Sequence, residues 1–135
     1  MNLSSFHVGS TPGIRTTDFH VGRYRLAKHL GTTSLNALDA DPKYARQLLL
    51  EEPSEFQSGR IPIFVCERCA GLDCGATTVA VEILEGVVTW SQFGREVPDR
   101  DSLLVSEIDA RTGPFHFDLT EYRSALRPYT RARPR

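Results

Sequence analysis

Three cysteines are the residues whose spacing most clearly suggests chemistry. Two residues separate Cys66 from Cys69, and four residues separate Cys69 from Cys74. Two thiolates at a C-x2-C spacing can bind one metal ion from a single turn, and Gly71 and Gly75 permit the tight backbone that such a knuckle needs. A structural zinc ion takes four ligands. The pattern therefore predicts one structural zinc ion, held by the three cysteines and one further ligand.

The sequence leaves the fourth zinc ligand open. Five side chains have suitable chemistry: His7, His20, His29, His116 and Asp73. A redox-active dithiol is a second interpretation, but it requires its first cysteine at the start of a helix, where the thiol pKa falls. Cys66 instead ends a predicted strand. A third interpretation is that the thiols are small apolar side chains, buried without a metal.

Strands are predicted on both sides of the cysteine segment. β-Branched aliphatic residues recur at every second position, at residues 61, 63 and 65 before it and at residues 79, 81 and 83 after it, and a period of two is typical of strands. A Glu-Gly turn at residues 85–86 leads into a third strand, residues 87–93, which carries Trp90. The pattern predicts an antiparallel sheet with a central cysteine-knuckle hairpin.

Two helices with clear starting signals are predicted to pack against this sheet. Asp41, followed by proline, begins the first helix near residues 42–51, because aspartate caps free amides and proline at the first position loses no hydrogen bond. Asp118 and Glu121 form a D-x-x-E capping pair at the start of the second helix, near residues 118–127. Together with the sheet, these signals predict an α+β fold with two or three packing helices.

The length and composition suit one domain. With 135 residues, 40% of them hydrophobic, the chain can bury a core of its own, so we predict a single α+β domain over residues 1–127. Residues 128–135 are predicted to be a flexible arginine-rich tail. No apolar run reaches the roughly 18–20 residues that span a membrane, and no signal-peptide pattern is present. We therefore predict a cytoplasmic protein with reduced thiols.

The tetrapeptide Phe-His-Val-Gly occurs twice, at residues 6–9 and 19–22. Four matching residues fall short of an internal repeat, so we interpret the match as coincidence. The first copy lies within residues 1–17, a stretch rich in Ser, Thr and Gly that is predicted to be a loop. The second copy alternates apolar and polar residues and predicts a short strand.

The net charge of −1 conceals an uneven distribution. Residues 1–50 carry a net charge of +3, residues 51–121 carry −9, and residues 122–135 carry +5. The acidic middle segment predicts a surface for a basic partner, the alternative being a surface that is simply solvated. Five carboxylates on the predicted hairpin and on the loop after it are the expected partner-binding residues: Glu82, Glu85, Glu96, Asp99 and Asp101.

The cysteine segment and the strands after it resemble a group of small bacterial proteins. The segments that carry this resemblance are residues 66–76, 78–79, 89–93, 113–115, 117–118 and Tyr122. The group has a CPECGDLGCGA-like knuckle, a TV-type strand, a WSDF-like strand end and a GPFTFD…Y segment. This chain departs from that pattern at residues 67–68 and at Gln92. The resemblance covers roughly residues 45–127 and implies the fold and a bacterial origin, but no activity.

No catalytic motif is present, since the sequence contains no Walker loop, G-x-G-x-x-G, H-E-x-x-H or G-x-S-x-G. We therefore predict a non-catalytic bacterial binding protein, most specifically an immunity protein or antitoxin that neutralises a partner toxin through its acidic surface. A metal- or thiol-dependent enzyme that uses the cysteines is one alternative. Another is a zinc-knuckle protein associated with nucleic acid, although the acidic middle segment would repel phosphate.

Overall fold

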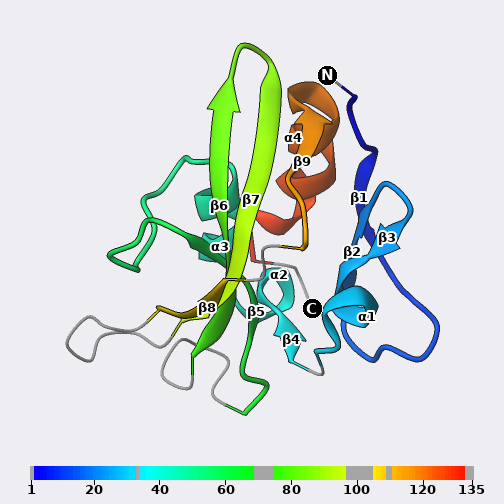
Figure 1. The fold of residues 1–135 in the computed structure, drawn as a ribbon, viewed down its shortest axis with the longest axis vertical. Helices are drawn as coiled ribbons and strands as arrows, with labels where there is room; N and C mark the ends of the chain where they lie inside the picture. The colour runs from blue at the N-terminus through cyan, green and yellow to red at the C-terminus, as the bar shows by residue number, and fades with distance from the viewer. Residues whose placement is uncertain (1, 33, 69–74, 97–104, 109–110, 133–135) are drawn as a thin grey trace.

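The structure, a computed structural model, describes residues 2–32, 34–68, 75–96, 105–108 and 111–132, and of residues 105–108 only the backbone. Within these residues the chain forms two antiparallel sheets with short helices packed against them (Figure 1). The predicted α+β class with an antiparallel sheet is confirmed. No helix in the described part of the chain is long and apolar enough to cross a membrane.

The first sheet is built from the two Phe-His-Val-Gly copies. Its strands are, in order, β1 (Phe6–Gly9), β2 (Asp18–Val21) and β3 (Tyr24–Arg25). β1 and β2 pair antiparallel, with Phe6 opposite Val21 and His7 opposite His20. The prediction that the first copy lies in a loop is wrong. A strand this short depends on its partner strand for stability, and the sequence did not reveal that partner.

The second sheet is organised around β7. Its strands are β4 (Leu35–Asn36), β5 (Ile61–Val65), β6 (Ala76–Leu84), β7 (Val87–Glu96), β8 (Val105–Ile108) and β9 (Phe115–Asp118). β6 pairs along one edge of β7, while β9 and β8 share the other edge. The strands predicted on both sides of the cysteines are confirmed, and β7 continues past its predicted end at residue 93. The knuckle falls mainly on residues 69–74, which lie outside the described part.

Two of the described helices, α3 and α4, begin where the sequence predicts, and for two shorter ones, α1 and α2, no starting signal was predicted. They are α1 (Leu26–Leu30), α2 (Ala37–Ala40), α3 (Pro42–Leu48) and α4 (Leu119–Leu126), which a 3-10 turn, η1 (Arg127–Tyr129), follows. Asp41 accepts the Lys43 amide and so caps α3, and Asp118 accepts the Glu121 amide and so caps α4. The Glu121 carboxylate accepts the amide of Phe6 at 2.8 Å and thereby joins α4 to β1.

The folded domain continues beyond the predicted start of the tail at residue 128. η1 packs against α3, and Thr130 is buried, with its carbonyl accepting a hydrogen bond from Arg46 Nη1 at 2.8 Å. Arg127 forms two hydrogen bonds of 2.8 and 3.0 Å to the Glu51 carboxylate. Residues 128–130 therefore belong to the domain, and the predicted boundary is too early.

Trp90 lies at the centre of the core and is fully buried. Five aromatic rings surround it with centroid separations of 5.3 to 6.2 Å: Phe6, Phe19, Phe93, Phe117 and Tyr122. Because these rings come from both sheets and from α4, the indole is the point at which all three parts of the fold meet. Offset and edge-to-face pairs of this kind stabilise a core beyond the area that they bury.

A chain of two hydrogen bonds satisfies the polar atoms in this core. Trp90 Nε1 donates to Tyr122 Oη at 3.0 Å, and Tyr122 Oη donates to the Leu48 carbonyl at 2.7 Å. Burial raises the pKa of the Tyr122 phenol, so the hydroxyl keeps the proton that it donates. The relay connects β7, α4 and the last residue of α3.

We expect Trp90→Ala to reduce the free energy of unfolding by about 3–5 kcal/mol, because it empties the centre of the core. Tyr122→Phe removes only the hydroxyl and should cost about 1–3 kcal/mol, since it leaves the Leu48 carbonyl and the indole N–H without partners. Urea unfolding followed by tryptophan fluorescence for Tyr122→Phe, and by circular dichroism for Trp90→Ala, measures both effects. Variants as stable as the parent would contradict the role given to this cluster.

Candidate functional site

Cys66 follows β5 directly and is half-buried. It lines a hollow of about 300 Å³ together with Phe64, Thr77 and two arginines, Arg68 and Arg95. The two guanidinium groups give this hollow a positive lining. An anionic group small enough to enter it would meet the thiol and the arginines together.

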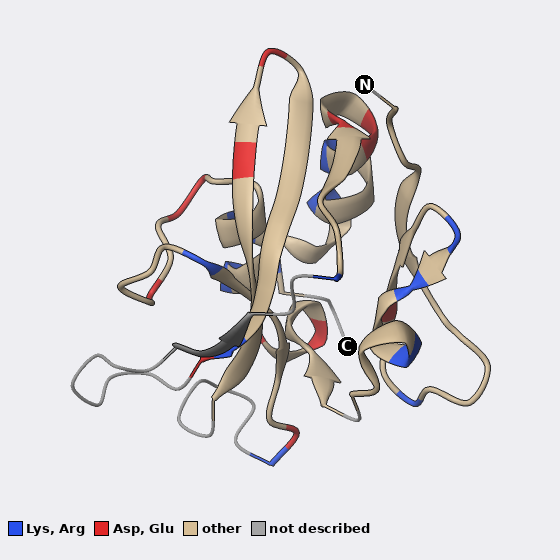
Figure 2. Ribbon diagram, in the orientation of Figure 1, with Lys and Arg blue, Asp and Glu red and all other residues tan. Residues whose placement is uncertain are grey.

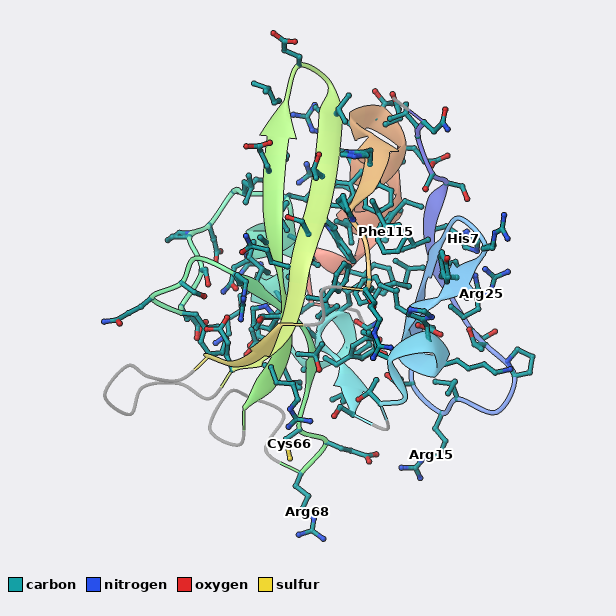
Figure 3. All side chains as sticks on the ribbon, viewed as in Figure 1. His7, Arg15, Arg25, Cys66, Arg68 and Phe115 are labelled. Carbon is teal, nitrogen blue, oxygen red and sulfur yellow. The ribbon has the colours of Figure 1, made fainter. Side chains whose placement is uncertain are left out.

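A second hollow, of about 550 Å³, adjoins the first, and Ser34 and Glu67 line both. Arg15 lines the second hollow and forms an exposed ion pair of 3.0 Å with Glu67. Figure 3 shows Arg15, Cys66 and Arg68 at the same end of the molecule. We call this region the cysteine end, and its charge is mainly positive, although the middle segment as a whole is acidic.

The zinc site proposed for Cys66, Cys69 and Cys74 stays a prediction, because Cys69 and Cys74 lie outside the described residues. Within the described part of the chain, no three histidine, cysteine, aspartate or glutamate side chains come together as a metal site. His7 lies well away from Cys66 (Figure 3), and the ring of His20 packs against that of His7. Neither histidine is therefore placed to share a metal ion with Cys66.

The β6–β7 hairpin exposes two of the predicted partner-binding residues, Glu82 and Glu85. Glu85 and Gly86 form its turn with φ values of 51° and 79°, and two positive φ values in succession are those of a type I′ turn. Leu84, next to the turn, is 63% exposed, whereas Ile83 on the opposite side of the strand packs against the core. The outer side of the hairpin is thus acidic with one exposed apolar side chain.

Two further carboxylates lie beside this turn. Asp118 and Glu121, at the start of α4, are exposed, and the Leu119 amide donates to the Gly86 carbonyl at 3.0 Å, so α4 begins against the hairpin turn. Acidic residues gather at this end of the molecule in Figure 2, on the hairpin and on the first turn of α4. We define the acidic end by four residues: Glu82, Glu85, Asp118 and Glu121.

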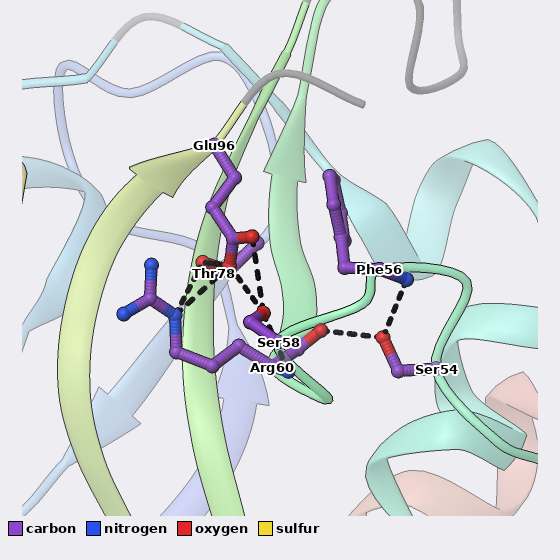
Figure 4. A network of polar contacts seen from close by, with 6 residues as sticks. All are labelled: Ser54, Phe56, Ser58, Arg60, Thr78 and Glu96. Carbon is purple, nitrogen blue, oxygen red and sulfur yellow. Dashed lines mark hydrogen bonds and ion pairs between the residues drawn. The ribbon is translucent and has the colours of Figure 1, made fainter. Parts of the chain in front are cut away.

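Glu96 does not belong to an exposed surface, and its prediction as an exposed partner-binding residue is wrong. It is the last residue of β7 and only 5% exposed. Its carboxylate accepts hydrogen bonds of 2.9 Å from Arg60 Nε, Thr78 Oγ1 and Ser58 Oγ (Figure 4). The sequence ended this strand at residue 93 and so placed residue 96 in a loop, which is why the burial was missed.

Sequence reasoning also left out part of the acidic end. Asp118 and Glu121 were predicted only to cap a helix, although the side chains of capping residues are often exposed and can also bind a partner. Leu84 was not considered as a surface residue, although continuing the alternation of residues 78–83 by one position places it on the polar side. The two remaining predicted partner-binding residues, Asp99 and Asp101, lie outside the described residues.

Comparisons with known proteins do not identify either end of the molecule. No family model, curated protein or solved structure matches the chain. Its function is therefore inferred from its own residues at the acidic end and the cysteine end.

If the three cysteines bind zinc, the purified protein should contain about one zinc ion per chain. Cys69→Ser should then lower both the zinc content and the melting temperature, because the metal contributes to the folding free energy. Elemental analysis and thermal unfolding measure the two quantities. Glu67→Gln, in the same segment, is the control and should leave the zinc content unchanged. A metal-free parent whose melting temperature is unchanged by Cys69→Ser would exclude the site.

The buried pair between Arg60 and Glu96 predicts a stability effect that an exposed carboxylate would not give. Glu96→Gln should cost about 3–5 kcal/mol, because it leaves the Arg60 charge buried without its counter-charge. The double variant Arg60→Met/Glu96→Leu should cost less than Glu96→Gln, since it removes both charges. Urea denaturation of the parent, the single variant and the double variant measures the free energies of unfolding and tests this order. A change below about 0.5 kcal/mol for Glu96→Gln is the behaviour of a surface residue and would contradict the burial.

Proposed function

We propose that this chain is a non-catalytic binding protein of the immunity or antitoxin type, which neutralises a toxin by covering a basic surface of it with the acidic end. The observation that carries the proposal is the exposure of Glu82 and Glu85 on a projecting hairpin, beside Asp118 and Glu121. Four carboxylates at one end of a small protein accelerate encounter with a basic partner and disfavour acidic ones.

The acidic end also offers apolar contact. Leu84 is opposite Val87 in the hairpin, and Val87 is opposite Asp118 of β9, so the three side chains form one row across the sheet. Leu84 is exposed and Val87 is half-buried. Protein interfaces combine an apolar centre, which supplies most of the affinity, with a polar rim that supplies selectivity. The apolar side chains of this row could therefore add affinity to a complex, beyond the electrostatic attraction of a basic partner by the carboxylates.

The conformation of Glu85 supports a role for its charge. A positive φ costs a residue other than glycine about 1–2 kcal/mol, and type I′ turns therefore favour asparagine, aspartate or glycine. Glu85 holds this position with a φ of 51°. Backbone strain of this kind is concentrated at functional positions. Glutamate at this position lowers the stability of the fold to some extent, but it places a carboxylate at the tip of the projecting hairpin.

A thiol-dependent enzyme is the second candidate, and the hollow at Cys66 favours it, because Arg68 and Arg95 could bind an anionic substrate beside the thiol. A nucleophilic cysteine also needs a base to activate it. Among the described residues that line this hollow, Glu67 is the one side chain able to act as a base, and it is already paired with Arg15. Binding through the acidic end is therefore the better supported function.

The test is a charge reversal at the acidic end, Glu82→Lys together with Glu85→Lys. The binding partner is the product of the gene adjacent to that of this chain, with association and dissociation rates measured by surface plasmon resonance. We expect Kd to rise by at least about tenfold, which corresponds to about 1.4 kcal/mol, with a slower association rate. Raising the salt concentration should slow association to the parent protein, because salt screens exposed charges. The melting temperature should hardly change.

Glu51→Lys together with Glu67→Lys is the matched control, since it changes the net charge equally and its two carboxylates form exposed ion pairs away from the hairpin. This control should bind the partner nearly as tightly as the parent. Equal losses for the two double variants, salt-insensitive association, or no binding to the neighbouring gene product would contradict the proposal.

A further inference from the structure

The pairing of the two Phe-His-Val-Gly copies places two histidines directly opposite each other. His7 on β1 and His20 on β2 are register partners. Their ring centroids are 4.3 Å apart and their planes meet at 72°. The neighbouring Phe6 and Phe19 are buried in the core, so both histidines lie on the other face of the first sheet, because strand side chains alternate between faces.

Hydrogen bonds fix the orientation of the His20 ring. Thr11 Oγ1 donates to Asp18 Oδ2 at 2.9 Å, since a carboxylate has no proton to donate. The Thr11 oxygen must then accept the 3.2 Å hydrogen bond from His20 Nε2. Asp18 is itself held by the amides of Phe19 and Ala27, which donate to its other oxygen at 2.8 and 2.7 Å.

The other ring nitrogen of His20, Nδ1, has no hydrogen-bond partner among the described residues. With the proton on Nε2, Nδ1 of the neutral ring carries a free lone pair. Nδ1 is buried and makes no hydrogen bond to any residue that the structure describes, and His20 as a whole is only 7% exposed. A buried nitrogen without a partner is uncommon and calls for a specific cause. An absent ligand is such a cause.

Gly9 leaves space between the two imidazoles. A Cβ atom at this position would lie 3.6 Å from His20 Cε1, 3.7 Å from His7 Cδ2 and 3.9 Å from His7 Nε2. The edges of both rings thus converge on one point that carries no side chain. His20 Cε1 lies between the two ring nitrogens, so the edge of the ring that carries Nδ1 and Nε2 borders this space, and Nδ1 is the nitrogen of that edge without a described hydrogen-bond partner.

We propose that His7 and His20 bind a divalent transition-metal ion of tetragonal preference, such as Ni²⁺ or Cu²⁺, through one ring nitrogen of His7 and Nδ1 of His20, with water completing the coordination. Two imidazoles that coordinate one ion at right angles, with metal–nitrogen distances of about 2.0–2.1 Å, have ring centroids about 4.5 Å apart. The observed separation of 4.3 Å fits this angle. Right angles between ligands are typical of Cu²⁺ and Ni²⁺.

The hydrogen bonds that join His20 Nε2 to Thr11 and Thr11 to Asp18 are those expected for a metal-binding histidine. Metal-binding histidines commonly donate their second ring N–H toward a carboxylate or another acceptor, which fixes the ring and increases its basicity. Here the path runs from His20 Nε2 through the Thr11 hydroxyl to Asp18. Asp18 also supplies a negative charge within the buried network.

Arg25 is the charged group that opposes a bound cation. It is the register partner of His20 on β3. Burial lowers the pKa of His20, as do His7 and Arg25, while Asp18 and the Ser10 carbonyl raise it. Because the Arg25 side chain is exposed, solvent screens its charge and weakens its repulsion of a bound cation.

The test is a titration of the full chain with Ni²⁺, followed by nuclear magnetic resonance of the histidine rings and backbone amides. Ni²⁺ is paramagnetic, so it broadens the signals of nearby nuclei and distinguishes this site from the cysteines. The rings of His7 and His20 should broaden first and saturably, before those of His29 and His116. His7→Ala, which removes an exposed side chain, should raise the Kd for Ni²⁺ at least tenfold without lowering the melting temperature.

Two variants test the geometry without removing a ligand. Gly9→Ala fills the space between the rings and should weaken Ni²⁺ binding at least tenfold, whereas Arg25→Gln removes the opposing charge and should strengthen it severalfold. His29→Ala is the matched control and should bind Ni²⁺ like the parent. The proposal is overturned if the His7 and His20 rings do not broaden selectively, or if His7→Ala binds Ni²⁺ as tightly as the parent.

Discussion

One tyrosine hydroxyl holds the centre of this fold together. Tyr122 Oη accepts a hydrogen bond from the Trp90 indole and donates one to the Leu48 carbonyl, so a single buried oxygen links the central strand, α4 and α3. Burying the indole without Tyr122 would leave its N–H unpaired in an apolar core, and the Tyr122 hydroxyl is itself satisfied by the Leu48 carbonyl. The aromatic side chains of both sheets pack around this pair, and the positions of the sheets and of α4 depend on it.

The aromatic core determines which charges reach the surface. The inner side of the β6–β7 hairpin packs against the core through Ile83 and Val88, and its outer side exposes Glu82 and Leu84. At the other end of β7, Glu96 turns away from solvent and neutralises Arg60 inside the fold. The hairpin therefore exposes its carboxylates to solvent, while the carboxylate at the far end of the strand has a structural role.

Structural features that depend only on residues adjacent in the sequence could be predicted from it. The caps at Asp41 and Asp118 and the turn at Glu85 each follow from a few adjacent side chains, and the structure confirms these elements. The burial of Glu96 and the strand formed by the first Phe-His-Val-Gly copy depend on partners far away in the chain. The second copy was predicted to be a strand, but the first lies in a stretch rich in Ser, Thr and Gly that was predicted to be a loop, and so the pairing of His7 with His20 was not predicted.

We propose that the acidic end, and not the cysteine end, is the partner-binding surface. Amide hydrogen exchange, compared between the free protein and its complex with the protein partner, tests this claim most directly. The account predicts slower exchange in residues 80–91 and at the start of α4, with exchange in residues 13–16 and 66–68 unchanged. Slower exchange at the cysteine end, with none at the hairpin, would contradict it.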